Sequence, residues 1–240
     1  MASVDPAVRF SGGGCRIRQL ILLTLTRKGF SVKRTFCCLM FAVVLTSAVR
    51  AEKNTILEPC LGKLTGQPEQ FSFDNPVDEP FQAIKGAWKV VDGALVGKEL
   101  AADKHAAVLN LAKKNRNSVI RFSFRTGGST DGLHFSLNHS GGHLFRIVVS
   151  PQNVVLNLDK DKKDPKSKAK TLAQVEGKFE SGRWYTMQVE MAGEKVAVQT
   201  DNGLRLEASH PSLDTDKPGY RFVMKGESLS IDDIFVWEMP

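Results

Sequence analysis

Side chains that could hydrogen-bond to a sugar recur at alternate positions between residues 121 and 159. Arginine, asparagine, histidine and serine offer donors and acceptors, and sugar recognition requires such groups in fixed positions. The candidate ligand-binding residues are Arg121, Ser123, Arg125, His134, Ser136, Asn138, Arg146 and Asn157. An antiparallel sheet with one solvated face carries similar residues without any ligand. The pattern therefore leaves two interpretations open, a saccharide-binding face and an ordinary exposed face.

Two residues of this region, His134 and Asp159, are candidates for acid–base catalysis. A histidine or a carboxylate can supply or accept a proton when it is held beside the reacting atom. No serine stands in a Gly-x-Ser-x-Gly turn, which is the nucleophile motif of many hydrolases. The sequence leaves open whether the protein is an enzyme; if it is one, we expect a hydrolase of glycosidic bonds.

Neither a metal nor another cofactor is expected. Strand alternation places His134 on the face opposite to a predicted His139–His143 pair, so the three histidines would not converge on one ion. The aspartates of segment 159–170 are interrupted by lysines and lack the glycine and the closing glutamate of a calcium loop. This segment is therefore interpreted as a solvated loop.

Alternating apolar residues indicate the elements that must hold these side chains. Large apolar residues occupy every second position of segments 119–125, 132–139 and 154–159, as in strands with one buried face. A fourth apolar run, residues 143–149, lies between the last two. We therefore predict a meander of four successive strands in one sheet, with all the candidate residues on its polar face.

The turn at Ser140, Gly141 and Gly142 determines the register of the central hairpin. A three-residue loop of this kind places a glycine in a left-handed conformation. Closing the loop pairs His139 with His143, Leu137 with Phe145, Ser136 with Arg146, and Phe135 with Ile147.

The rest of the chain from residue 69 onward also consists of short strands separated by turns. Asp92-Gly93 is a two-residue hairpin turn, and further strands follow from Trp184 to Glu238. About a dozen short strands without a sustained helical period indicate an all-β fold, a concanavalin-like jelly-roll sandwich of two antiparallel sheets. Residues 69–240 are expected to form this single domain, after an irregular lead-in over residues 52–68.

Residues 1–51 are expected to be a leader that contains a signal peptide. Lys33 and Arg34 precede an apolar run from Phe36 to Leu45, and Ala51 is a small residue suited to a cleavage site. The run is shorter than the roughly 20 residues of a membrane span, so we expect no stable span after cleavage. The functional signal is predicted at residues 32–51, with export to the periplasm or the cell exterior. A retained N-terminal anchor helix is the alternative.

The net charge of +7 comes from the leader rather than from the predicted domain. The leader holds eight of the 33 Lys and Arg residues and one of the 26 Asp and Glu residues, so 25 of each sign remain from Glu52 onward. Binding to nucleic acid depends on an excess of basic residues, and the domain lacks this excess. We therefore expect no nucleic-acid partner.

The order of several motifs resembles that of a known family. The motifs are GRWYTMQVE at 182–190, VAV at 196–198, DNG at 201–203 and LSIDDIFVW at 229–237. Their order is similar to that of concanavalin-like and laminin-G-like jelly rolls. With Phe73, the hairpin at 88–96 and the strand at 120–125, the chain resembles the 3-keto-disaccharide hydrolase-like domain of secreted bacterial proteins.

This resemblance implies a concave, sugar-facing sheet and, in some members, cleavage of oxidised disaccharides. Segment 130–136 lacks the arginine of the family's Asn-Ser-Gly-hydrophobic-Arg strand, and LFRI at 144–147 replaces its acidic strand. The Glu-x-Asp-x-x-Glu strand of laminarinase-type relatives is also missing, and with it the carboxylate pair that hydrolyses glycosides. Binding is therefore favoured over catalysis.

These observations predict an exported carbohydrate-recognition domain that acts in saccharide binding or breakdown, with a glycan or small saccharide as its partner. One alternative is a hydrolase or lyase acting on 3-keto-disaccharides or related glycosides. The second alternative is a non-catalytic periplasmic or surface scaffold.

Overall fold

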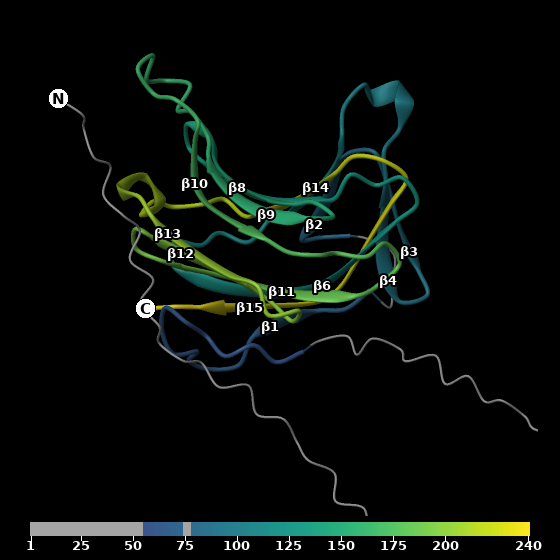
Figure 1. Cartoon of the computed structure of the whole chain (residues 1–240), viewed down its shortest axis with the longest axis horizontal. Helices are drawn as coiled ribbons and strands as arrows, with labels where there is room; N and C mark the ends of the chain where they lie inside the picture. The colour runs from purple at the N-terminus through teal and green to yellow at the C-terminus, as the bar shows by residue number, and fades with distance from the viewer. Residues whose placement is uncertain (1–54, 74–77) are drawn as a thin grey trace, which may run out of the picture. The chain divides into compact units, whose positions relative to one another are not determined.

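Two antiparallel sheets form the computed structural model, which describes residues 55–73 and 78–240 (Figure 1). Sheet A consists, in spatial order, of β13 (Arg205–Ser209), β12 (Lys195–Thr200), β11 (Tyr185–Ala192), β6 (Ser118–Gly127), β15 (Ser228–Glu238), β4 (Ala94–Lys98) and β3 (Ala87–Val91), with β1 (Glu69–Phe71) paired to β15. Sheet B consists of β10 (Lys170–Glu176), β9 (Asn153–Leu158), β8 (Gly142–Val149), β7 (Leu133–His139), β14 (Tyr220–Met224), β5 (Ala107–Leu111) and β2 (Phe81–Lys85). The predicted jelly-roll sandwich is confirmed.

Helical structure in the described ranges is limited to two short 3₁₀ turns, η1 (Ala101–Asp103) and η2 (Pro211–Leu213). Neither of these turns is long and apolar enough to cross a membrane. The predicted leader, residues 1–51, lies outside the described residues.

The core lies between the two sheets and is rich in aromatic side chains. Phe122 of β6 meets Phe222 of β14 edge to face, with ring centroids 5.1 Å apart, and Phe135 of β7 lies 5.5 Å from the same ring. All three rings are fully buried. Removing each from water contributes about 2–3 kcal/mol to folding, so these contacts hold the sheets face to face.

The predicted four-strand meander is wrong in one respect, because β6 belongs to sheet A and not to sheet B. β6 pairs with β11 and β15, whereas β7, β8 and β9 are neighbours in sheet B. The chain crosses between the sheets after Gly127. Gly128 (φ 59°) and Gly132 (φ 139°) adopt conformations in this connection that favour glycine. Alternation shows which face of a strand is buried, but not which strand lies beside it.

The predicted hairpin register is confirmed for Leu137–Phe145, Ser136–Arg146 and Phe135–Ile147. It is wrong at the turn, where Asn138 pairs with His143, and His139 pairs with Gly142. The cause is a β-bulge at Leu144, which lets Leu144 and Phe145 both enter the core. The connecting loop therefore contains two residues, Ser140 and Gly141, rather than three.

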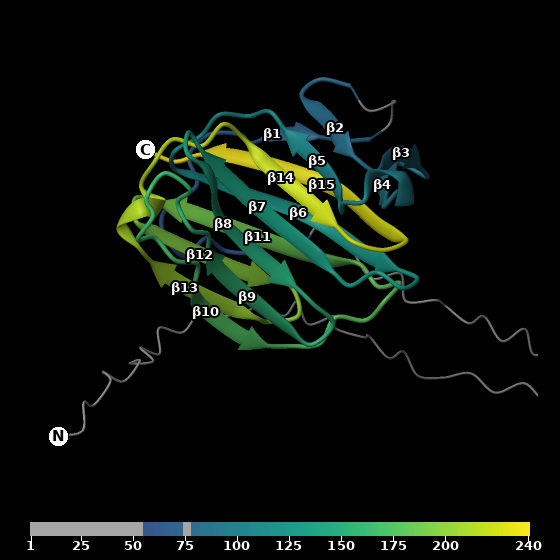
Figure 2. The ribbon, with the colours of Figure 1, turned by 90° about the horizontal axis from the view of Figure 1, so that it is seen from above.

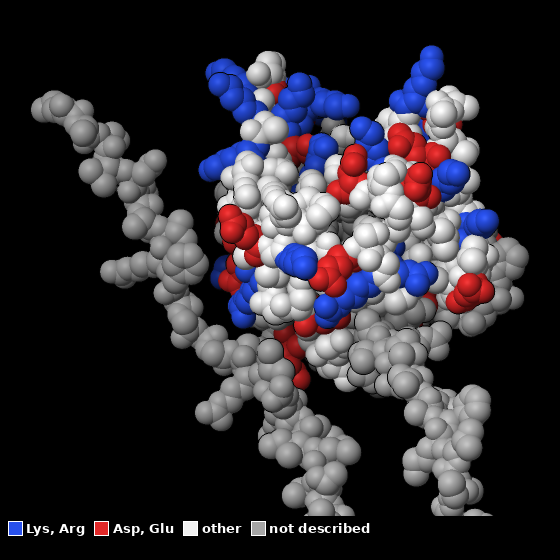
Figure 3. Space-filling model, turned by 45° about the vertical axis from the view of Figure 1, so that its right-hand side comes forward, with Lys and Arg blue, Asp and Glu red and all other residues white. Residues whose placement is uncertain are grey.

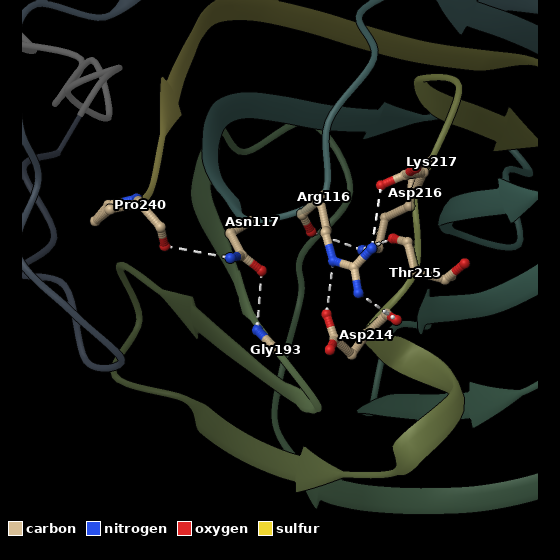
Figure 4. A network of polar contacts seen from close by, with 8 residues as sticks. All are labelled: Arg116, Asn117, Gly193, Asp214, Thr215, Asp216, Lys217 and Pro240. Carbon is tan, nitrogen blue, oxygen red and sulfur yellow. Dashed lines mark hydrogen bonds and ion pairs between the residues drawn. The ribbon is translucent and has the colours of Figure 1, made fainter.

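A network of polar contacts joins the segment before β6 to the segment before β14 (Figure 4). Lys217 is only 2% exposed, and its Nζ donates hydrogen bonds to the carbonyl oxygens of Arg116 (2.7 Å) and Thr215 (2.8 Å). Arg116 Nε in turn donates to Asp214 at 2.9 Å. Burial lowers the pKa of Lys217 to about 8, and the nearby Arg116 acts in the same direction.

Candidate functional site

Seven polar residues form one continuous row across the outer face of sheet B. Each is the register partner of the next, in the order Gln82, Asn110, Arg221, Ser136, Arg146, Asn157 and Thr171. Because adjacent strands lie about 4.8 Å apart, the row is about 29 Å long. We call these seven residues the polar row. Its length suits an oligosaccharide better than a single sugar ring.

The polar row lies on the floor of a trough. The loop from Asp159 to Ala169 and the η1 loop, residues 99–106, rise above sheet B at opposite ends of its strands (Figure 1), and Figure 2 shows β7 and β14 in the middle of that sheet. A cavity of about 130 Å³ at the centre is lined by residues that include His134, Arg146 and Arg221. It shares His134 and Arg146 with a hollow of about 380 Å³ beside β10. The larger hollow is within the size range of ligand-binding clefts.

Arg146 and Asp159 form a two-pronged ion pair in the trough. Nε of Arg146 donates to Oδ2 of Asp159 at 3.1 Å, and Nη2 donates to Oδ1. Such a pair fixes the plane of the guanidinium group. Arg146 is still 39% exposed, so it can contact a ligand from this fixed position.

Arg221 is held by neutral groups only. Nε donates to Asn110 Oδ1 at 3.2 Å, while Nη1 lies 3.4 Å from Asn138 Oδ1 and 3.1 Å from His143 Nδ1. Within the described part of the chain, no carboxylate lies within ion-pair distance of this guanidinium. Burial and the neighbouring Arg146 both lower the pKa of Arg221, as expected for a partly desolvated cation without an acidic partner.

The surroundings of two histidines in the trough lower their pKa values and so favour the neutral form. Burial and, secondarily, Arg146 lower the pKa of His134; burial and Arg221 lower the pKa of His143. Both side chains line the central cavity, together with His105. The predicted placement of His134 and His143 on opposite faces is therefore wrong, because the bulge at Leu144 reverses the alternation before it.

The trough supplies one carboxylate to a ligand, and that group is already paired. The trough has a third hollow, of about 170 Å³, whose lining includes Gln82 and Asn110. Among the described residues that line the three hollows, Asp159 is the only acidic side chain. Glycoside hydrolysis by the common mechanisms needs two carboxylates on either side of the scissile bond. The arrangement can therefore bind and orient a sugar, but it does not contain such a pair.

Of the predicted ligand-binding residues, the structure brings five together. His134, Ser136, Asn138, Arg146 and Asn157 all lie on the outer face of sheet B, as does the catalytic candidate Asp159.

The other three predicted residues lie on the outer face of sheet A, on the opposite side of the sandwich. Arg121 is 8% exposed, with its guanidinium carbon 5.0 Å from the Phe235 ring and 5.1 Å from the Trp237 ring. Ser123 is 1% exposed. Arg125 packs over Trp184 at 4.8 Å. These residues consequently cannot share a ligand with the trough.

The lead-in segment covers part of that face (Figure 1). Its backbone nitrogens at Cys60 and Leu61 donate to the Glu190 carboxylate, with Oε2 at 2.7 and 2.8 Å. Gln188 and Gln199 donate to the other oxygen at 3.1 and 3.0 Å. Glu190 is fully buried, so this carboxylate is the anchor of the lead-in.

Several trough residues were not among the sequence candidates: Gln82, Asn110, His143, Thr171 and Arg221. Alternation in segment 220–224 already separates Arg221 from the buried Tyr220 and Phe222. The sequence does not show that this strand lies beside β7, because the two are far apart along the chain.

No protein-family model matches the chain, and no curated protein sequence is similar to it. Solved structures with a similar fold include the carbohydrate-binding module CBM66 from Bacillus subtilis, with 10% identity and a TM-score of 0.54 over 66% of this chain and 95% of that one. A GlcNAcα1-4Gal-releasing endo-β-galactosidase from Clostridium perfringens has 11% identity and a TM-score of 0.52 over 75% of this chain and 65% of that one. A sialidase has 9% identity and a TM-score of 0.54 over 72% of this chain, which spans only 18% of that protein. At these identities the likeness shows the fold, a jelly-roll sandwich.

Proposed function

We propose that this protein is an exported carbohydrate-recognition protein that binds a saccharide chain in the trough over sheet B. The observation that carries the proposal is the polar row, which places seven hydrogen-bonding side chains in register across every strand of the sheet. Rigid strands fix the spacing of these groups, as recognition of a hydroxyl-rich ligand requires. The similar fold of a carbohydrate-binding module also supports a role in saccharide binding.

A glycan screen on the full chain tests this proposal. Binding to a panel of oligosaccharides and polysaccharides is measured by thermal shift and isothermal titration, and every hit is checked for products. We expect a ligand that raises the melting temperature and stays intact. Absence of any saccharide ligand would contradict the proposal and favour the scaffold alternative.

Two substitutions assign the binding face. Arg146→Ala should weaken binding of the hit by about tenfold, since a hydrogen bond from a charged group is worth roughly 1.5–3 kcal/mol. Arg125→Ala, on the opposite sheet, should leave the affinity unchanged. The reverse result would place the ligand on sheet A.

Catalysis on 3-keto-disaccharides or related glycosides is the second candidate, and one observation favours it. His134 lines the central cavity with Arg146 and Asp159, and its lowered pKa favours the neutral imidazole that a general base requires. The screen therefore includes 3-keto-disaccharides. Turnover that is lost in His134→Ala would establish that the protein is an enzyme. Ligands that stay intact would support saccharide binding without catalysis.

Export is part of the same proposal and is tested separately. Mass spectrometry of the protein from the exported fraction should show an N-terminus at Glu52. A mature protein that retains residues 32–51 would indicate the anchor-helix alternative.

A further inference from the structure

We infer that the ligand of the trough is an acidic saccharide, with a carboxylate or sulfate group seated on Arg221. This inference rests on the proposed function and specifies its substrate class. Arg221 is one of the two cations of the polar row, and its described partners are the neutral groups of Asn110, Asn138 and His143. A guanidinium group offers paired N–H donors that match the oxygens of a carboxylate. The anion that would complete its contacts is therefore left to the ligand.

A second observation is the cluster of positively charged side chains at one end of the trough. Five exposed lysines occupy the loop after β9, namely Lys160, Lys162, Lys163, Lys166 and Lys168, and the exposed Lys170 follows them at the start of β10. Of the three acidic residues in this loop, Asp159 is paired with Arg146, and the other two accept from backbone groups of the loop: Asp161 Oδ1 from Lys163 N at 2.8 Å and Asp164 Oδ1 from Lys166 N at 2.9 Å. Figure 3 shows the basic side chains gathered on this protrusion above the trough. Because residues 52–240 carry no net charge, the positive potential is a local feature of this site.

The third observation is the lack of aromatic platforms. Tyr220 is the one Trp, Tyr or Phe residue among the described residues that line the three hollows, and it is fully buried. Trp88 and Trp237 belong to sheet A, and Trp184 packs with Arg125 of the same sheet. A trough without stacking surfaces must hold its ligand through charge and hydrogen bonds. The same lack argues against single-stranded nucleic acid, which binds largely by stacking of bases on aromatic rings.

Binding of defined polymers to the full chain tests the inference. The probes are polygalacturonate as the carboxylate polymer, dextran sulfate as the sulfate polymer, dextran as the neutral polymer, and single-stranded poly-dT. Dissociation constants are measured by isothermal titration at low and at high salt. We expect the carboxylate or the sulfate polymer to bind about tenfold or more tightly than dextran, with an affinity that falls at high salt. The stronger of these two identifies the acidic group.

Variants of Arg221 show whether this side chain carries the preference. Arg221→Ala should weaken binding of the acidic polymer by about 10- to 100-fold and leave binding of dextran unchanged. Arg221→Lys, which keeps the charge but not the paired donors, should be intermediate. Arg183→Ala removes an exposed arginine next to β11 in sheet A and is the matched control. Unchanged melting temperatures show that the variants are folded. If Arg221→Ala does not fold, the comparison is made with Arg221→Lys.

The outcomes separate this inference from the proposed function. Binding of neutral saccharides in the trough without a preference for acidic ones would overturn the inference and leave the proposed function standing. If no saccharide binds, both the inference and the proposed function are overturned. Equal affinity for poly-dT, or acidic-polymer binding that Arg183→Ala weakens as much as Arg221→Ala, would also overturn the inference.

Discussion

Nη1 of Arg221 lies 3.1 Å from Nδ1 of His143 at the centre of the trough. Nδ1 also lies 2.9 Å from Oδ1 of Asn138, so the contact it makes depends on the tautomer: a lone pair on Nδ1 accepts from Arg221, whereas an N–H on Nδ1 donates to Asn138. Burial and Arg221 lower the pKa of His143, which favours the neutral ring. Of the other charged groups, Asp159 raises this pKa, while Arg146 and Lys162 lower it. An anion on Arg221 would offset these cations and raise the pKa of His143.

The affinity for an acidic saccharide is therefore expected to rise as pH falls. The complex binds more protons than the free protein in the range below about pH 6.5, the ordinary pKa of histidine, so protonation and binding favour one another. Titrations with polygalacturonate at pH 7.5, 6.5 and 5.5 should give progressively lower dissociation constants. His143→Asn should flatten this trend, with His134 as the remaining titrating group. A trend equally steep in His143→Asn would exclude His143 as its source.

Asp159→Asn is expected to strengthen binding of an acidic polymer several-fold. The substitution removes the carboxylate that is paired with Arg146, so this guanidinium can form its ion pair with the ligand instead. Asp161→Asn adds the same charge to the loop but leaves the Arg146 pair intact, which makes it the control. If the protein is instead an enzyme that uses Asp159, the same variant would lose turnover, and product analysis distinguishes the two results.

Glu190→Ala is expected to destabilise the fold by about 3 kcal/mol or more. The variant leaves backbone N–H groups of Cys60 and Leu61 and two glutamine amides without their acceptor, and each buried orphan donor costs roughly 1–3 kcal/mol. Urea unfolding measures the loss, and limited proteolysis should show faster cleavage within residues 55–64. Glu207→Ala, at an exposed position of β13, should change stability by less than about 1 kcal/mol. Equal effects of both variants would contradict the anchoring role of Glu190.

The lowered pKa of Lys217 predicts that the stability of the protein rises with pH. Its pKa is about 8 in the folded protein and 10.5 ordinarily, so the unfolded chain binds more protons between these values. The free energy of unfolding should therefore increase between pH 8 and 9.5, with a limit of about 3 kcal/mol for the full window. Lys217→Met should lack this component, whatever its stability at pH 7. Parallel pH profiles of the two proteins would show that Lys217 is not the cause. Tyr220 has a raised pKa and would act in the opposite direction above pH 10, which sets the upper limit of the measurement.

Local patterns predicted the strands well because their signals are local. The Asp92-Gly93 turn needs positive φ at both residues, and the structure has φ values of 51° and 73° there. Apolar residues at alternate positions of β6 and β7 are fully or almost fully buried. These features depend only on neighbours along the chain, which the sequence displays directly.

The arrangement of the site depends on contacts that the sequence does not display. Arg221 reaches Ser136 and Asn110 only because β14 inserts between β7 and β5, and nothing in segment 220–224 specifies those neighbours. The bulge at Leu144 moves His143 onto the trough face, against strict alternation. β6 carries polar residues for a different reason, since its outer face packs under Phe235, Trp237 and the lead-in.

The anchoring of the lead-in by Glu190 determines how the molecule would face its surroundings. Thr55 donates to Thr186 and the segment continues to Leu61, all on the outer side of sheet A. A solid support coupled to the protein at Thr55 would therefore lie on the side of sheet A, away from the trough. The trough, on the opposite sheet, would then remain accessible to polymers in solution.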